Sequence, residues 1–157
     1  MRSFKSVGIT GADLTTQNNA AAPTPLPVGI VTPLRPGQPG DGLLAMHFQV
    51  GTQMKNNLRD LILTNWGERV MSYDYGANLG PLVTEYEKGK DQFDGAAMER
   101  INRAVSKWMP FVVLEGYDST YNETTDPGLG FITILLDYSI PRALVPTTRL
   151  QVTFAVS

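Results

Sequence analysis

One stretch of this 157-residue chain, residues 57–79, carries most of the information about its fold, and it reads NLRDLILTNWGERVMSYDYGANL. Its first part continues a helical repeat that begins several residues earlier. The apolar positions on one face of this helix are Val50, Met54, Leu58, Leu61 and Ile62. Glycine accepts the left-handed conformation that closes many helices, so Trp66-Gly67 is expected to end this one. Gly67 and Gly76 are predicted to be structural turn positions in an irregular connector that extends to residue 90.

A second helix is expected after the connector. It is predicted to begin near Asp91, with Asp94 in its first turn, where negative charge complements the helix dipole. Pro110 stops it, because proline cannot continue a helix. Its apolar stripe consists of Ala97, Ile101, Ala104, Val105 and Trp108. Both predicted helices therefore have one face to bury.

The remaining sequence has the pattern of strands. Residues 111–117 open with an apolar run, residues 129–138 are rich in β-branched and aromatic side chains, and residues 149–156 alternate strictly. Turn-forming residues in 118–128 and 141–146 separate the three. Because helices precede strands without β-α-β alternation, we predict an α+β fold in which two main helices pack on a small, mainly antiparallel sheet.

The first 42 residues differ from the rest, since they hold six of the eleven prolines. Proline fixes φ and removes a hydrogen-bond donor, so this segment is expected to be an extended arm and neither a helix nor a central strand. The sequence therefore predicts two parts: an extended Pro/Gly-rich arm, residues 1–42, and one globular domain, residues 43–157.

Composition argues against several classes of function. The chain has no cysteine and one histidine, His47, which is expected to be an ordinary strand or loop side chain, so we expect neither a metal nor a cofactor. A formal charge of -2 provides no basic field for nucleic acid. No apolar run approaches the roughly 20 residues that cross a bilayer, and no signal-peptide core follows the first residues. We therefore expect no nucleic acid, no membrane and no export.

Three carboxylates near the connector are candidates for acid/base chemistry: Asp60, Glu68 and Asp74. A glycosidase needs two carboxyl groups about 5 to 9.5 Å apart, one of them with a raised pKa. The sequence does not supply that distance. The alternative interpretation is that Glu68 forms a local ion pair with Arg69, or that the two bind backbone donors in the connector.

The order of residues in 57–79 resembles the signature region of the baseplate wedge, lysozyme-like family of contractile phage tails, which is also related to a baseplate component of type VI secretion. In that family a helix ending in leucines and threonine runs into Gly-Glu-Arg-Val-Met, as at residues 67–71 here. An acidic, aromatic and glycine turn and a leucine follow, as at residues 74–79. The resemblance covers residues 43–157 and leaves the arm without a counterpart.

The resemblance implies a structural subunit and not an enzyme: a sheath initiator whose fold is similar to the inner domain of the sheath protein. Such a subunit would occur in multiple copies in a sixfold tail baseplate of the virion, after assembly in the host cytoplasm. The implied partners are other wedge proteins and the tail sheath protein. Apart from the resemblance, the arm is expected to reach tail tube or hub proteins. The alternative function is a muramidase-like hydrolase of cell-wall glycan with Glu68 as its acid.

The resemblance also implies where partners bind. After Trp108 the family typically has Glu-Pro-Arg, whereas this chain has Met109-Pro110-Phe111, so we expect an apolar contact to replace the charged one. Residues 149–157 would accept a sheath strand through an unpaired edge. The predicted partner-binding residues are Glu68, Arg69, Asp74, Trp108, Met109, Pro110, Phe111, Arg149, Leu150, Gln151, Val152, Thr153 and Phe154.

Overall fold

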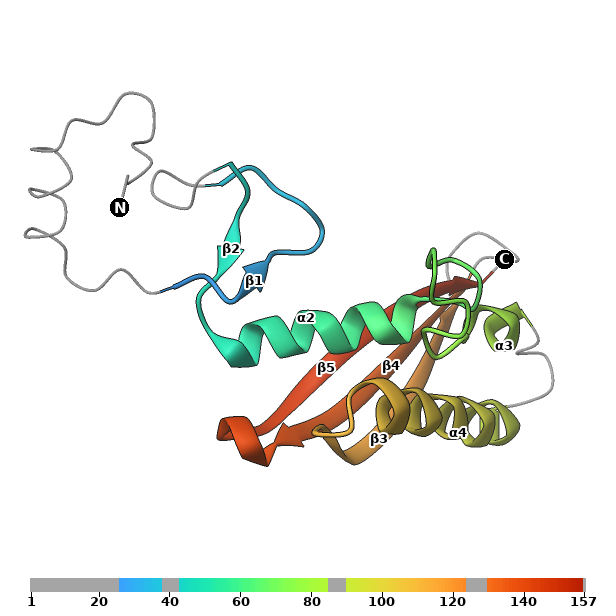
Figure 1. The fold of residues 1–157 in the computed structure, drawn as a ribbon. Coiled ribbons are helices and arrows are strands. Elements are labelled where there is room, and N and C mark those ends of the chain that lie inside the picture. The colour runs from blue at the N-terminus through green and yellow to red at the C-terminus, as the bar shows by residue number, and fades with distance from the viewer. Residues whose placement is uncertain (1–25, 38–42, 85–89, 124–129, 157) are drawn as a thin grey trace, which may run out of the picture.

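The computed structural model describes residues 26–37, 43–84, 90–123 and 130–156 (Figure 1). Its elements in chain order are β1 (Gly29–Ile30), β2 (Met46–His47), α2 (Val50–Leu63), α3 (Gly80–Thr84), α4 (Lys90–Trp108), β3 (Val113–Glu123), β4 (Gly130–Ile140), a 3-10 turn (Pro141–Ala143) and β5 (Val145–Val156). The predicted α+β class is confirmed. Residues 1–25 and 38–42 of the predicted arm lie outside the described residues.

The three long strands form one antiparallel sheet in the order β3-β4-β5. Along the central strand β4, alternate residues from Gly130 to Ile140 are buried. In β5 the same face carries Leu150 and Val152, which are 2% and 3% exposed, while Gln151 and Thr153 are exposed. The alternation predicted for the last strand is therefore confirmed over these positions, with one face in the core and one face in water.

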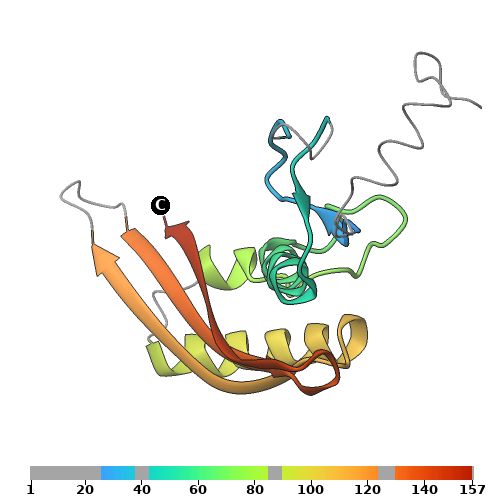
Figure 2. The same ribbon diagram turned by 90° about the vertical axis from the view of Figure 1, so that its left-hand side faces the viewer.

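The helices cover the inner face of this sheet (Figure 2). α2 packs beside β5, α4 packs beside β3, and the two helices contact each other. The apolar faces predicted for both helices are buried except at the start of α2, where Val50 is 45% exposed, and at Met54 and Trp108, which are partly buried. Each buried aliphatic side chain contributes roughly 1.5–3 kcal/mol relative to its exposed state. The residues of α2 and α4 in this core are Leu58, Leu61, Ile62, Phe93, Ala97, Ile101, Ala104 and Val105.

Three predicted boundaries are wrong. β5 begins at Val145, within the predicted turn segment 141–146 and before the predicted start at residue 149, because Val145 already pairs with Ile140 of β4. α2 ends at Leu63 and not at residues 66–67, because Thr64 has an extended backbone and its hydroxyl donates to the Asp60 carbonyl at 2.6 Å. β3 continues to residue 123, through part of the predicted loop 118–128. Ser119 in that part is buried, pairs with Ile134 of β4 and donates a hydrogen bond of 2.5 Å to Asp94 of α4. Pairing with β4 therefore outweighs the local preference for a turn.

Strands β1 and β2 pair with each other and lie on the side of α2 turned away from the three-stranded sheet (Figures 1 and 2). The Thr32 hydroxyl donates to the Asp60 carboxylate at 3.2 Å, and the Asn56 amide lies 2.8 Å from Nε2 of His47. These contacts fasten the paired segment to α2. The described arm residues 26–37 are non-helical, as predicted, and the division of the chain after residue 42 stays a prediction.

Candidate functional site

The chain leaves α2 and returns to it through residues 64–79, which we call the return loop. Inside the loop the Gly67 N–H donates to the Tyr73 carbonyl at 2.8 Å. At its end the Ala77 N–H donates to the Leu61 carbonyl at 3.0 Å, and the Asn78 N–H donates to the Thr64 carbonyl at 3.3 Å. Main-chain hydrogen bonds therefore hold both halves of the loop against the end of α2.

Gly76 is the residue that allows this return. Its φ is +108°, and a Cβ built on it would lie 2.1 Å from the Thr64 carbonyl oxygen. Gly67 also has a positive φ, +87°. Both glycines thus occupy turn positions that an L side chain would strain, and at Gly76 the neighbouring backbone leaves no room for a side chain.

Glu68 acts within the return loop as an acceptor for Asn65. Its two carboxylate oxygens accept from the Asn65 N–H at 2.7 Å and from the Asn65 side-chain amide at 2.9 Å. The Asn65 amide oxygen in turn accepts from the Gly80 N–H at 2.9 Å, at the start of α3. The backbone hydrogen bond from Asn65 lowers the pKa of Glu68. Glu68 therefore binds a backbone donor, whereas Arg69 stacks over the Tyr75 ring at 4.2 Å.

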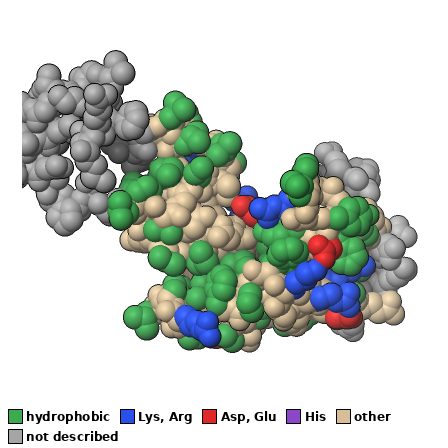
Figure 3. Space-filling view, in the orientation of Figure 1, with side chains coloured by type: hydrophobic (Ala, Val, Ile, Leu, Met, Phe, Trp, Pro, Cys, Tyr) green, Lys and Arg blue, Asp and Glu red, His purple; other side chains and the backbone are tan. Residues whose placement is uncertain are grey.

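Asp74 and Trp108 connect the return loop to the end of α4. Asp74 forms an ion pair with Lys107, whose hydrogen bond lowers the pKa of Asp74. The Tyr75 ring meets the Trp108 ring edge-on, with centroids 5.2 Å apart. Exposed ion pairs contribute little individually, so ring packing carries most of this contact. Figure 3 shows acidic and basic side chains mixed with hydrophobic ones over this part of the molecule.

The triplet after α4 divides between core and surface. Met109 is 5% exposed and belongs to the core, Phe111 is half-buried against it, and Pro110 is exposed. Met109 therefore offers a partner little surface in this conformation. A contact of this triplet with a partner stays a prediction, and a charge placed at Met109 would disturb the core before it disturbed any docking.

A hollow of about 360 Å³ lies between α2 and the return loop and brings two of the three candidate carboxylates together, Asp60 and Glu68. Asp74 lines a different hollow, beside Trp108. A glycosidase acid needs a raised pKa, and the pKa of Glu68 is lowered. Within the described ranges, no group of three or more His, Asp or Glu side chains is placed to hold a metal ion. None of the described helices is long and apolar enough to span a membrane.

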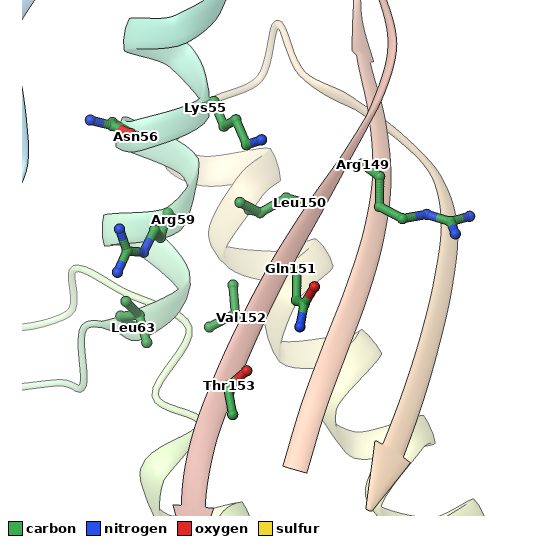
Figure 4. A pocket seen from close by; sticks show the side chains of 9 residues that line it. All are labelled: Lys55, Asn56, Arg59, Leu63, Arg149, Leu150, Gln151, Val152 and Thr153. Atoms are coloured by element: carbon green, nitrogen blue, oxygen red, sulfur yellow. The ribbon is translucent and has the colours of Figure 1, made fainter. Parts of the chain in front are cut away.

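A larger groove, of about 620 Å³, lies between α2 and β5 (Figure 4). Five of the six predicted β5 residues, 149–153, line it, and Phe154 packs against the core instead. The side chains of Leu150 and Val152 point toward α2, and Lys55 reaches from α2 toward β5. In the described part of the chain β5 pairs only with β4, so the edge of β5 away from β4 carries no neighbouring strand.

Arg149 is already engaged on the outer face of the sheet. Its guanidinium donates two hydrogen bonds to Asp137 of β4, at 2.7 and 2.8 Å, and this lowers the pKa of Asp137. The opposite wall of the groove carries Lys55 and Arg59, which sequence reasoning did not select. Their four-residue spacing on one helix was the available signal, because it places two cations on the same face.

No protein-family model matches this chain, and no curated protein matches it. Solved structures do. A Geobacter sulfurreducens protein provisionally named a tail lysozyme is 18% identical, with a TM-score of 0.50 over 68% of this chain and 90% of that one. A chain of the sixfold-symmetrised anti-feeding prophage baseplate is 17% identical, with a TM-score of 0.51 over 80% and 82%. A chain of the type VI secretion baseplate complex is 19% identical, with a TM-score of 0.43 over 68% and 93%.

At identities of 17–19%, these similarities show a shared fold and do not show a shared function. The first two structures, with TM-scores of at least 0.5, are named for a tail lysozyme and for a baseplate. The resemblance to the baseplate, lysozyme-like family that residues 57–79 indicated is thus confirmed at the level of the fold.

Gly76→Ala is expected to lower the free energy of unfolding by about 1–3 kcal/mol or more, because it combines a positive φ with a clash against the Thr64 carbonyl. Urea unfolding followed by circular dichroism measures this change. The matched control is Gly95→Ala in α4, where a Cβ meets nothing within 4 Å, and helix propensity predicts a gain of roughly 0.5–1 kcal/mol. Equal effects of the two substitutions would contradict the role of Gly76.

Glu68→Gln is expected to destabilise the chain at pH 7 and to matter progressively less in acid. The folded-state pKa of Glu68 lies below the ordinary value of 4.5, so its stabilising effect is complete above that value and is lost as pH falls through the folded pKa. Thermal unfolding of both proteins at pH 7 and pH 3 checks this. The control is Glu99→Gln on α4, whose exposed pair with Arg103 should contribute little. A difference between wild type and Glu68→Gln that is independent of pH would contradict the assignment.

Proposed function

We propose that this chain is a structural wedge subunit of a contractile tail baseplate, linking the baseplate to the first sheath ring and templating sheath assembly. The observation that carries this proposal is the edge of β5 that no strand of the described residues pairs with and that borders the groove beside α2. An unpaired row of N–H and C=O groups can accept a strand from another protein. The fold shared with a baseplate chain supports the same assignment.

The return loop is proposed as the surface for neighbouring wedge proteins. Val70, Met71 and Tyr73 are 87%, 100% and 76% exposed, which is unusual for three large apolar side chains within four residues. The hydrogen bonds and ring contacts described above fix the loop before any partner arrives. Ordering of this loop therefore costs little on association, and the predicted residues Glu68, Arg69, Asp74 and Trp108 serve by holding the loop in shape.

The arm, residues 1–42, is proposed to reach tail tube or hub proteins from the point where its described part is fastened to α2 through Thr32, and residues 43–157 are proposed to form the wedge domain. Multiple copies would surround a sixfold axis, in a virion assembled in the host cytoplasm. A sixfold-symmetrised baseplate contains a chain of this fold, which supports that arrangement. No cofactor, nucleic acid or membrane enters the proposed role.

Hydrolysis of cell-wall glycan is the second candidate, because one protein of this fold carries the name tail lysozyme. Asp60 and Glu68 share a hollow, but the backbone hydrogen bond from Asn65 lowers the pKa of Glu68, whereas a glycosidase general acid needs a raised pKa. We therefore expect the purified chain to release no soluble fragments from peptidoglycan, with hen lysozyme as positive control. Turnover that disappears in Glu68→Gln while the thermal unfolding midpoint stays unchanged would establish the hydrolase.

Substitutions on the exposed face of β5 test the templating role. Removing the last nine residues would also remove Leu150 and Val152 from the core, so exposed positions serve better. Gln151→Lys combined with Thr153→Lys is expected to leave the fold intact and to reduce sheath-bearing particles severalfold, because lysines on an edge strand oppose pairing with another strand. Counting sheathed and unsheathed particles by electron microscopy measures this.

The matched control is Thr120→Lys on β3, the other outer strand of the same sheet, which should leave sheath assembly unchanged. Cryo-electron microscopy of wild-type particles should place this fold between the baseplate and the first sheath ring, with a foreign strand beside β5. Sheath assembly that is equally normal in both variants, or absence of the chain from tail-like particles, would refute the proposal.

A further inference from the structure

We propose that the strand accepted by β5 carries carboxylates on its face toward α2, opposite Lys55 and Arg59, and an apolar side chain opposite Leu63. This inference rests on the proposed function, because it takes the groove between α2 and β5 as the site of strand addition. It goes further by specifying the sequence pattern and the register of the partner strand.

The charge of the α2 wall points to an acidic partner. Lys55 and Arg59 are exposed and line the groove, and neither forms an ion pair or side-chain hydrogen bond with any described residue. Like charges four residues apart on a helix repel, and the positions one turn beyond them, Gly51 and Leu63, carry no compensating carboxylate. The cation of the other wall, Arg149, is already neutralised by Asp137. Two uncompensated positive charges therefore border an unpaired strand edge.

The spacing of these cations matches that of a strand. Four residues of helix rise about 6 Å, and two residues of strand rise about 6.8 Å. Side chains on one face of a strand are two residues apart, so carboxylates at alternate positions can lie opposite Lys55 and Arg59. The Lys55 side chain already extends toward β5, whereas the Arg59 guanidinium points away from β5 in Figure 4. Its long flexible stem allows it to turn toward a partner strand.

The position of Leu63 fixes the order of residues in the partner. In Figure 4 Lys55 lies at the level of Arg149 and Leu150, whereas Leu63 lies at the level of Val152. A strand antiparallel to β5, the commoner arrangement, would begin near Val152 and end near Leu150. Its residues facing α2 should therefore be apolar, acidic and acidic in chain order. A nucleic acid would satisfy the two cations but not the row of backbone groups on β5.

A synthetic peptide tests this pattern. The probe is Thr-Val-Thr-Glu-Thr-Glu-Thr, acetylated, amidated and fluorescently labelled, and two matched peptides carry glutamine or lysine in place of both glutamates. Two exposed ion pairs predict that the acidic peptide binds roughly two- to thirtyfold more tightly than the glutamine peptide at low salt. That advantage should shrink as salt rises to about 0.15 M. Fluorescence anisotropy of the full chain gives the affinities, and backbone amide shifts locate the peptide on β5.

Variants of the α2 wall complete the experiment. Lys55→Gln combined with Arg59→Gln should abolish the preference for the acidic peptide, and Lys55→Glu combined with Arg59→Glu should reverse it in favour of the lysine peptide. Both positions are exposed, so circular dichroism should show an unchanged fold. Equal binding of all three peptides beside β5 would overturn this inference while leaving strand addition in place. Binding away from the groove, or no binding at all, would also overturn this inference. The proposed function is tested separately, by the counts of sheathed and unsheathed particles for the Gln151→Lys, Thr153→Lys variant.

Discussion

The close approach of Gly76 to the Thr64 carbonyl is the contact on which the rest of the structure depends. Because no side chain intervenes, the chain returns to the end of α2, and Ala77 and Leu79 enter the core at 2% and 0% exposure. The Asn65 side-chain oxygen then accepts a hydrogen bond from the Gly80 N–H at the start of α3, and α4 packs beside α2. The two long helices thereby lie side by side on one face of a three-stranded sheet, which neither helix would cover alone.

The sequence predicted the features that depend on local spacing. The helical repeat located the buried faces of α2 and α4, and strict alternation located the inner face of β5 at Leu150 and Val152. The length of β3 was missed because Asp118, Ser119 and Asn122 favour turns locally, whereas their pairing with β4 is a tertiary effect. The groove was missed for the same reason. It exists only because α2 packs beside β5, and the spacing of Lys55 and Arg59 alone looks like that of any exposed helix.

α2 is held from three directions, and this decides how its charges are presented. The paired strands β1 and β2 are fastened to one side through Asp60 and Asn56, the sheet packs on another side, and the return loop closes its C-terminal end. A helix so restrained keeps its cationic face at a constant position relative to β5. Recognition at that groove then requires little rearrangement of this chain, so more of the contact energy is available for affinity.

The antiparallel pairing of β5 with β4, from Val145 opposite Ile140 to Val156 opposite Gly130, has a mechanical consequence. A force along β5 loads the backbone hydrogen bonds between β4 and β5 together, in shear. A force perpendicular to the strand would instead break these hydrogen bonds one after another. The cross-strand pair of Arg149 with Asp137 adds a side-chain fastening within the same ladder. Tension reaching β5 along its axis is therefore shared over the length of the sheet, and it passes to α2, which packs beside β5, and through β4 and β3 to α4.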